Sequence, residues 1–379
     1  MKLLSLEKFT ESLNSKNPSY REFLSVATVR IGERLVPLRQ YSQEKKIDVT
    51  MLKLLYENIC NRDAYLGRFY RLSLYVDPDR LLIDEKPMTA RTLNNNTLTV
   101  YKNLIRNIHW LDILKNTHSG IENVPTYLNV LEDLYKNHII DYKILTPSSL
   151  HYMKEGRLGS VFSSYYFRAS IMNPYLVYSL NMNVLQGKRI FTPTLGWSSY
   201  CCGFLQCPFV EEYVGTDVIS SVCTKTREIA SVFSQCHNAK YEIFCEPSEN
   251  LAESTPFLNK YREHFDVVFF SPPYYRLELY AGKNQSTERY KSYEEWLEKY
   301  WEKTIQLCAH VLQKGGKLCY ILSGYGSDNT TDKYDLLKDM NTITAKYFQK
   351  KRILPMHNKD VYVTQHKETA EKIMIFVKE

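Results

Sequence analysis

The residues best suited to chemistry close the apolar run 265–275, Phe-Asp-Val-Val-Phe-Phe-Ser-Pro-Pro-Tyr-Tyr. The run predicts a buried strand, which must end at Ser271 because the two prolines that follow lack N–H groups and fix φ. The backbone there is stiff, its carbonyl oxygens have no partner in the sheet, and the ring of Tyr274 comes next. An acceptor array beside a stacking surface suits a planar ring that carries an exocyclic amino group. We therefore expect a catalytic site in this turn.

The elements that must position this turn alternate between strand and helix after Gly187, which is typical of an α/β fold with a parallel sheet and crossover helices. A long amphipathic helix is expected over 293–312, ending before Gly315 and Gly316, and the last two strands are expected to form a pair. The predicted strands are 189–191, 213–217, 241–245, 265–270, 317–322, 352–354 and 371–377.

Four consecutive strand ends carry polar or special residues, and ligands of open α/β sheets bind beyond the carboxyl ends of the strands. The turn at Gly196 would let the amino-acid tail of a cofactor approach backbone N–H groups at a helix start. Asp217 is placed either to accept hydrogen bonds from both ribose hydroxyls of an adenosyl group or to cap a helix. Because the other strand ends are also occupied, the ribose interpretation is favoured. Glu246 or Ser248 would read an adenine edge, or else are solvated loop residues.

The turn Ser271-Pro272-Pro273-Tyr274 resembles the catalytic motif of the amino-methyltransferases, which move a methyl group from S-adenosylmethionine to the exocyclic nitrogen of adenine or cytosine. The resemblance implies that the Ser271 side chain and the Pro272 carbonyl accept the N–H bonds of that nitrogen. It implies that Tyr274 stacks on the base, which must leave any duplex to reach the pocket. The mechanism would rest on positioning and electrostatics, without a metal.

The resemblance covers roughly residues 157–379 and implies a Rossmann-like class I methyltransferase sheet with S-adenosylmethionine as its cofactor. The segment around Asn173 and Pro174 looks like the one that packs beside the methionine moiety in this family. The stretch 277–296 resembles the one that follows the catalytic turn in phage- and virus-type members, although Trp296 and Tyr300 are expected to be helix core.

The cofactor turn departs from the family pattern, which begins with an acidic residue and carries two or more glycines. Here Thr192 or Thr194 stands at the acidic place, and Ser198 stands where a glycine is common. Either cofactor binding relies on hydroxyls and backbone groups, or it is weakened or lost. The identity of the target base, adenine or cytosine, stays open.

Residues 1–145 are expected to form a helical N-terminal region with a possible substrate-binding role, followed by the methyltransferase domain at 146–379. Loops 276–292 and 324–332 are further candidates for substrate contact. Lys350-Lys351-Arg352 and Arg157 are candidates for phosphate contact, although ordinary surface charge is the favoured interpretation for each residue.

The composition of the chain bears on its partners and on the compartment in which it works. Lys and Arg number 49 against 42 Asp and Glu, so the net charge of +7 permits a polyanionic partner. Nine cysteines without regular spacing indicate a reducing compartment, and the cluster of Cys201, Cys202 and Cys207 is interpreted as buried apolar residues instead of a zinc site. Early charge at the N-terminus and the lack of an apolar run of about 20 residues predict a soluble intracellular protein, in cytoplasm or nucleus, without membrane contact.

Three hypotheses follow from the sequence. The first is a DNA amino-methyltransferase that uses S-adenosylmethionine. The second keeps the chemistry but makes the substrate RNA. The third is a partner subunit that binds nucleic acid with a decayed cofactor site. Oligomeric state is not predicted.

Overall fold

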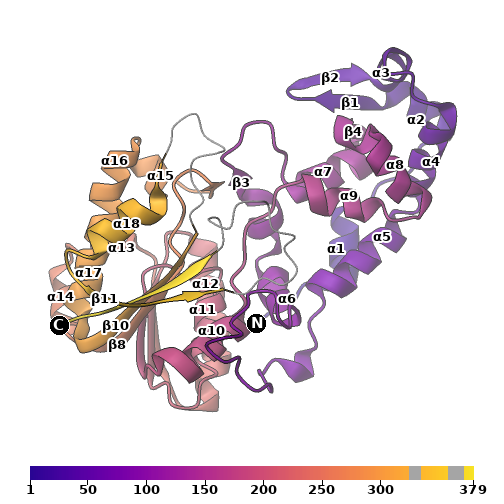
Figure 1. Cartoon of the computed structure of the whole chain (residues 1–379). Helices are drawn as coiled ribbons and strands as arrows, with labels where there is room; N and C mark the ends of the chain where they lie inside the picture. The colour runs from indigo at the N-terminus through magenta and orange to yellow at the C-terminus, as the bar shows by residue number, and fades with distance from the viewer. Residues whose placement is uncertain (324–333, 357–370) are drawn as a thin grey trace. The chain divides into compact units, whose positions relative to one another are not determined.

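The computed structural model describes residues 1–323, 334–356 and 371–379. They form two compact units, each treated separately (Figure 1). The sheet unit comprises Met1, Val76–His109 and Ser170–Glu379, and the helical unit comprises Lys2–Tyr75 and Trp110–Ala169. Among the described residues, no helix combines the length and the apolarity needed to cross a membrane.

The boundary between the two units does not fall at residue 145, where the sequence predicted it. Residues 76–109 belong to the sheet unit because they bond to the helix that starts at Pro174. Met88 N–H donates to Ser179 Oγ at 2.9 Å, and the Tyr175 hydroxyl donates to the Lys86 carbonyl at 2.5 Å. Residues 146–169 stay with the helical unit, where Tyr127 N–H donates to the Phe167 carbonyl at 2.6 Å.

The helical unit is mainly helical, as expected, but it also contains a three-stranded sheet of order β2-β1-β4 that the sequence analysis did not predict. Helix α4 buries Leu52, Leu55 and Ile59 at helical spacing, and Asp48 caps it by accepting from Thr50 N–H at 2.8 Å. The elements are α1 Leu6–Ser12, α2 Tyr20–Val26, β1 Thr28–Ile31, β2 Arg34–Pro37, α3 Leu38–Glu44, α4 Val49–Cys60, α5 Arg62–Phe69, η1 Tyr70–Leu74, η3 Asp112–Asn116, β3 His118–Ser119, α7 Tyr127–Glu132, η4 Asp133–Asn137, β4 Ile139–Asp141, η5 Tyr142–Leu145, α8 Pro147–Lys154 and α9 Leu158–Tyr165.

The sheet unit is built on a seven-stranded sheet of order β11-β12-β10-β8-β5-β6-β7. Strands β5, β6, β7, β8 and β10 pair in parallel, whereas β12 runs antiparallel to both β10 and β11. The predicted Rossmann-like class I methyltransferase fold, with its C-terminal antiparallel pair, is thereby confirmed. The bounds are β5 Arg189–Thr192, β6 Glu212–Thr216, β7 Lys240–Phe244, β8 Phe265–Phe270, β10 Leu312–Leu322, β11 Gln349–Pro355 and β12 Lys372–Val377.

Helices cover both faces of this sheet, as Figure 1 shows, with α10, α11 and α12 on one side and α13, α14, α16, α17 and α18 on the other. Because both faces are covered, central strands such as β8 are almost wholly buried and read as continuous apolar runs. The helix expected over 293–312 is observed as α16, η8 and α17 in succession. The remaining elements are η2 Pro78–Arg80, α6 Val100–Ile108, α10 Pro174–Leu180, η6 Asn181–Leu185, α11 Ser199–Phe204, α12 Ser220–Phe233, η7 Ser234–Cys236, α13 Ser248–Leu251, α14 Thr255–Lys260, β9 Glu278–Leu279, α15 Ser286–Arg289, α16 Tyr293–Trp296, η8 Leu297–Glu302, α17 Lys303–Val311 and α18 Leu336–Thr344.

Candidate functional site

A cavity of about 190 Å³ opens at the carboxyl ends of the parallel strands, within the sheet unit. It is far larger than the roughly 15 Å³ that one buried water needs, so it has the size of a ligand site. The chain reverses its direction of travel across the sheet at β5, which lies between β6 and β8, and open α/β sheets bind ligands at such a point. All four predicted strand ends contribute to the lining: the turn at Gly196, Asp217, the segment 246–248 and the turn 271–274.

The predicted catalytic turn forms one wall of this cavity, with Ser271, Pro272, Pro273 and Tyr274 all in the lining. Ser271 is held on both sides: its N–H donates to the Tyr200 hydroxyl at 3.0 Å, and its Oγ donates to the Ile321 carbonyl at 3.2 Å. Because the Ser271 hydroxyl hydrogen is engaged by Ile321, its oxygen can present lone pairs to a donor.

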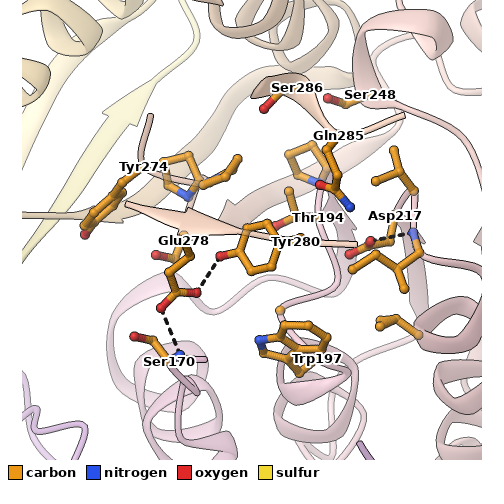
Figure 2. A pocket seen from close by; sticks show the side chains of 18 of the residues that line it. Ser170, Thr194, Trp197, Asp217, Ser248, Tyr274, Glu278, Tyr280, Gln285 and Ser286 are labelled. Carbon is orange, nitrogen blue, oxygen red and sulfur yellow. Dashed lines mark hydrogen bonds between the residues drawn. The ribbon is translucent and has the colours of Figure 1, made fainter. Parts of the chain in front are cut away.

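Tyr274 is fixed by its hydroxyl oxygen, which accepts from Ser323 N–H at 2.9 Å. Burial raises the pKa of this phenol, so the hydroxyl is neutral at physiological pH. In Figure 2, Tyr274 stands on one side of the view and Asp217 on the other, with Tyr280 between them. The ring predicted to stack on a substrate thus lies across the cavity from the carboxylate predicted to hold a ribose.

The cofactor turn has an unusual backbone. Gly196, Trp197 and Ser198 have φ values of 52°, 57° and 70°, so three successive residues lie in the left-handed region. That region favours glycine, yet two of the three residues carry side chains. Ser198 Oγ shares one hydrogen bond with Thr226 Oγ1, at 2.7 Å, and another with His109 Nε2, at 2.8 Å, and these hold the residue in place. The turn therefore adopts a backbone shape that glycine favours without the family's second glycine.

Gly196 cannot be replaced cheaply, because a Cβ at this position would lie 2.2 Å from the Tyr200 ring. We expect Gly196→Ala to lower the free energy of unfolding by about 2 kcal/mol or more, through left-handed strain and the displaced ring. Gly315→Ala is the matched control: φ is also positive, at 75°, but nothing lies within 4 Å, so only about 1 kcal/mol should be lost. Urea denaturation measures both, and equal losses would contradict the role assigned to the Tyr200 contact.

Asp217 lines the cavity at the end of β6, and its carboxylate is tied to both flanking loops. Oδ2 accepts from Leu195 N–H and Oδ1 from Ile219 N–H, each at 3.1 Å. Burial raises the pKa of the carboxyl, and these backbone N–H groups oppose the rise. The helix-cap alternative does not hold, because the N-cap of α12 is Ile219.

Three residues predicted to bind the cofactor do not line the cavity. Thr192 is fully buried, and its Oγ1 pairs with the Tyr213 hydroxyl at 2.7 Å, so of the two candidate threonines only Thr194 reaches the lining. Asn173 caps α10 by accepting from Tyr175 N–H at 3.0 Å, and Pro174 is the first residue of that helix. The sequence signals at these positions reflect helix capping and core packing.

The end of β7 contributes Glu246, Ser248 and Glu249 to the lining. Glu246 is exposed, whereas Ser248 is buried and shares a hydrogen bond with Thr304 Oγ1 at 2.8 Å. Glu249 was not singled out from the sequence. Its buried carboxylate pairs with Arg289 at 2.8 Å, and burial raises its pKa against the opposing charge of that arginine.

The segment after the Ser-Pro-Pro-Tyr turn contributes to the lining of the cavity. Glu278 accepts from Ser170 N–H at 3.0 Å and from the Tyr280 hydroxyl at 2.7 Å, as the dashed lines in Figure 2 show. The Tyr280 ring meets the Trp197 ring edge to face at a centroid distance of 5.8 Å. This segment therefore joins the catalytic turn to the cofactor turn, and several of its residues line the cavity, as expected for loop 276–292: Leu277, Glu278, Tyr280, Asn284, Gln285 and Ser286.

Two further lining residues, Tyr200 and Glu371, were missed from the sequence. Tyr200 carried a local signal, since it lies four residues after Gly196 at the expected start of a helix. Glu371 carried none, because only the pairing of β12 with β10 brings it to the cavity. Trp296 and Tyr300 are buried as expected, and Tyr300 also lines the cavity.

The structure also places the three clustered cysteines and two of the basic residues considered for phosphate contact. Cys201, Cys202 and Cys207 are free cysteines, outside any disulfide, and all three are buried, as their apolar interpretation predicted. Arg157 is exposed and pairs with Glu155 at 3.1 Å, and Arg352 is exposed. Loop 324–332 and the side chains of Lys350 and Lys351 lie outside the described residues.

Comparison with known proteins finds no matching family model and no matching curated protein. Solved structures with some likeness include TrmN from Thermus thermophilus, at 12% identity over 55% of this chain and 49% of TrmN, with a TM-score of 0.37. The chain thus spans about half the length of TrmN.

Another is the N-methyltransferase NodS from Bradyrhizobium japonicum WM9, at 12% identity over 54% of this chain and 91% of NodS, with a TM-score of 0.33. A third is the [4+2]-cyclase SpnF, at 12% identity over 55% of this chain and 84% of SpnF, with a TM-score of 0.38. Likenesses this distant assign neither a reaction nor a substrate. From its own strand order and strand directions, the sheet unit has the Rossmann-like class I methyltransferase fold.

Proposed function

We propose that this chain transfers a methyl group from S-adenosylmethionine to the exocyclic amino group of adenine or cytosine in DNA. One observation carries the proposal: the Ser-Pro-Pro-Tyr turn forms a wall of the same cavity that Asp217 and the Gly196 turn enter from the neighbouring strands. A methyl donor held by those strand ends would face the acceptors of the turn. Holding the two reactants together in one cavity would lower the barrier by fixing their orientation before the reaction.

The turn supplies acceptors suited to an amino group. Ser271 Oγ has its own hydrogen engaged by Ile321, and none of the described residues donates a hydrogen bond to the Pro272 carbonyl. Both oxygens would accept N–H bonds from the exocyclic amine. That nitrogen is a poor nucleophile because its lone pair is delocalised into the ring, and two acceptors would favour a tetrahedral nitrogen with its lone pair directed away from the ring plane. Tyr274 would hold the base by stacking.

The charge of the cavity fits a cationic cofactor. Its lining includes five carboxylic acids, Asp217, Glu246, Glu249, Glu278 and Glu371, and no Lys or Arg among the described residues. When bound, S-adenosylmethionine supplies an electrophilic methyl group on a positively charged sulfur. Carboxylates at short range stabilise such a charge, more strongly in a partly buried site than in water. Asp217 would also accept ribose hydroxyls through the lone pairs that its two backbone bonds leave available.

The proposal that the substrate is a nucleic acid is supported by the charge of the chain outside the cavity. The helical unit holds 19 Lys and Arg against 14 Asp and Glu, so most of the basic excess of the chain belongs to it. A basic excess favours the phosphates of a nucleic acid, and an acidic cavity leaves those phosphates outside while a base enters. RNA would meet the same description and is the second candidate substrate.

Calorimetry and a transfer assay test the proposal in two steps. The purified chain is first titrated with S-adenosylmethionine, and heat of binding is expected. The absence of heat at millimolar cofactor would overturn both enzyme hypotheses and favour a nucleic-acid-binding partner subunit. Tritiated methyl transfer onto DNA and RNA, followed by digestion to nucleosides, then identifies the polymer and the base. Methylation of RNA alone would overturn the assignment to DNA.

A further inference from the structure

Glu371 differs from the other carboxylates of the cavity because none of the described residues donates a hydrogen bond to its side-chain carboxylate, although its backbone carbonyl accepts from Met356 N–H at 3.3 Å. Glu278 accepts from Ser170 and Tyr280, and Asp217 accepts from two backbone N–H groups. Glu249 is held by Arg289, at 2.8 Å. Glu371 lines the same cavity and is partly buried, so its carboxylate has lost part of its hydration without gaining a hydrogen-bond donor from the part of the chain that the structure describes. An acceptor in that condition is available to a ligand.

The strand ladder places Glu371 beside the catalytic turn. In the antiparallel pair of β10 and β12, Leu322 lies opposite Lys372, so the next pair along brings Glu371 beside Ser323. Ser323 N–H donates to the Tyr274 hydroxyl at 2.9 Å, and two residues earlier the Ile321 carbonyl accepts from Ser271 Oγ. The same end of β10 therefore holds the first and last residues of the turn and carries Glu371 on its other edge.

Among residues 1–323, 334–356 and 371–379, three titratable groups interact electrostatically with Glu371: Tyr274, Tyr200 and Lys102. The hydroxyls of Tyr274 and Tyr200 interact with it electrostatically, and burial raises the pKa of both phenols. From α6, Lys102 is the opposing charge. Burial raises the pKa of the Glu371 carboxyl above its ordinary value, and Lys102 only partly offsets this. A carboxylate of raised proton affinity is a better proton acceptor than an exposed one.

We propose that Glu371 is the proton acceptor of the methyl transfer, a role that rests on the proposed function above. The amino nitrogen forms a bond to the methyl carbon while the carbon–sulfur bond breaks, and the electron pair of that bond stays on sulfur. The nitrogen gains positive charge and must lose one of its protons. Glu371 takes this proton and passes it to water, which leaves a neutral methylated amine and a neutral thioether. In this scheme Ser271 and Pro272 orient the amine, and Glu371 removes the charge that forms on it.

The test replaces Glu371 by glutamine and measures single-turnover methyl transfer from pH 5 to 9. In the unaltered protein the rate should rise with pH through one ionisation and then level off, because the base works only when deprotonated. In Glu371→Gln the plateau should fall by about 10²-fold and this ionisation should vanish. Glu298→Gln is the matched control, since Glu298 is exposed on η8 outside the cavity and should change nothing. An unchanged rate and pH profile in Glu371→Gln would overturn the proposal.

Two further measurements separate a proton acceptor from a structural residue. Glu371→Ala should regain part of its rate when formate is added, because a small carboxylate can occupy the vacated space. Absence of rescue in a folded protein would overturn the assignment. Calorimetry should show only a small loss of affinity for S-adenosylmethionine in Glu371→Gln, because four other carboxylic acids line the cavity. A loss as large as that expected for Asp217→Asn would indicate a cofactor-binding role instead. If the unaltered chain neither binds the cofactor nor transfers methyl, the proposed function itself fails, which is a distinguishable result.

Discussion

Replacing Tyr274 by alanine should lower the rate of methyl transfer by about 10²-fold or more while leaving the affinity for S-adenosylmethionine nearly unchanged. Stacking of a base on an aromatic ring contributes about 1–3 kcal/mol, and loss of the correct orientation adds to this. The ring is fixed in place by Ser323 N–H, so its removal also opens the wall of the cavity on the substrate side. Single-turnover transfer onto a DNA substrate, with cofactor binding measured by calorimetry, checks both halves of this expectation.

Tyr274→Phe is the matched control, because it keeps the ring and removes only the hydroxyl that accepts from Ser323. It should retain most of the rate if stacking is the main contribution. Pro272→Ala should also lose about 10²-fold, since alanine frees φ and introduces an N–H group into the acceptor array. If Tyr274→Ala and Pro272→Ala both transfer methyl as well as the unaltered chain, the catalytic assignment of the turn is wrong.

Asp217→Asn should weaken the binding of S-adenosylmethionine by between about 10- and 100-fold. The amide keeps the shape of the side chain but removes its charge, and hydrogen bonds to a charged acceptor contribute about 1.5–3 kcal/mol. One of the two backbone N–H groups, on Leu195 or Ile219, would then face an amide NH₂ in place of an oxygen. Calorimetric titration with the cofactor measures the loss.

Asp266→Asn controls for this backbone effect. Asp266 also accepts two backbone N–H bonds, from Lys188 at 3.0 Å and Arg189 at 2.9 Å, but it lies at the amino end of β8, away from the cavity. Both variants should lose similar amounts of stability in urea, and only Asp217→Asn should lose cofactor affinity. Equal affinities in the two variants would contradict the ribose contact.

The sequence alone was sufficient to predict the fold and the wall of the cavity that carries the Ser-Pro-Pro-Tyr turn. Strands of the covered sheet are buried on both faces, so they appear as apolar runs such as 265–270, and the two prolines mark where one of them must stop. Because parallel strands end at one edge of the sheet, Asp217 and the turn could be placed in one site without knowing any contact.

A polar residue at the end of a helix or strand can either bind a ligand or stabilise the fold, and the sequence alone could not separate these two roles. Asn173 and Thr192 are polar residues at element ends, and the structure uses one to cap α10 and the other to bond Tyr213 inside the core. The same ambiguity affected the domain boundary, since residues 76–109 resemble ordinary loop and helix yet pack into the sheet unit. Capping, packing and ligand binding all favour the same residue types at such positions.

Tertiary structure alone decided which carboxylates share the cavity and which are already engaged. Glu371 follows Glu278 by more than ninety residues in the chain, and no spacing links the two. The β10–β12 register brings Glu371 beside Ser323, whereas the Glu278 carboxylate is taken by Ser170 and Tyr280. Whether a carboxylate has a donor depends on neighbours that are distant in sequence. This long-range pairing brings the carboxylate that we propose as the proton acceptor to the edge of the Ser-Pro-Pro-Tyr turn.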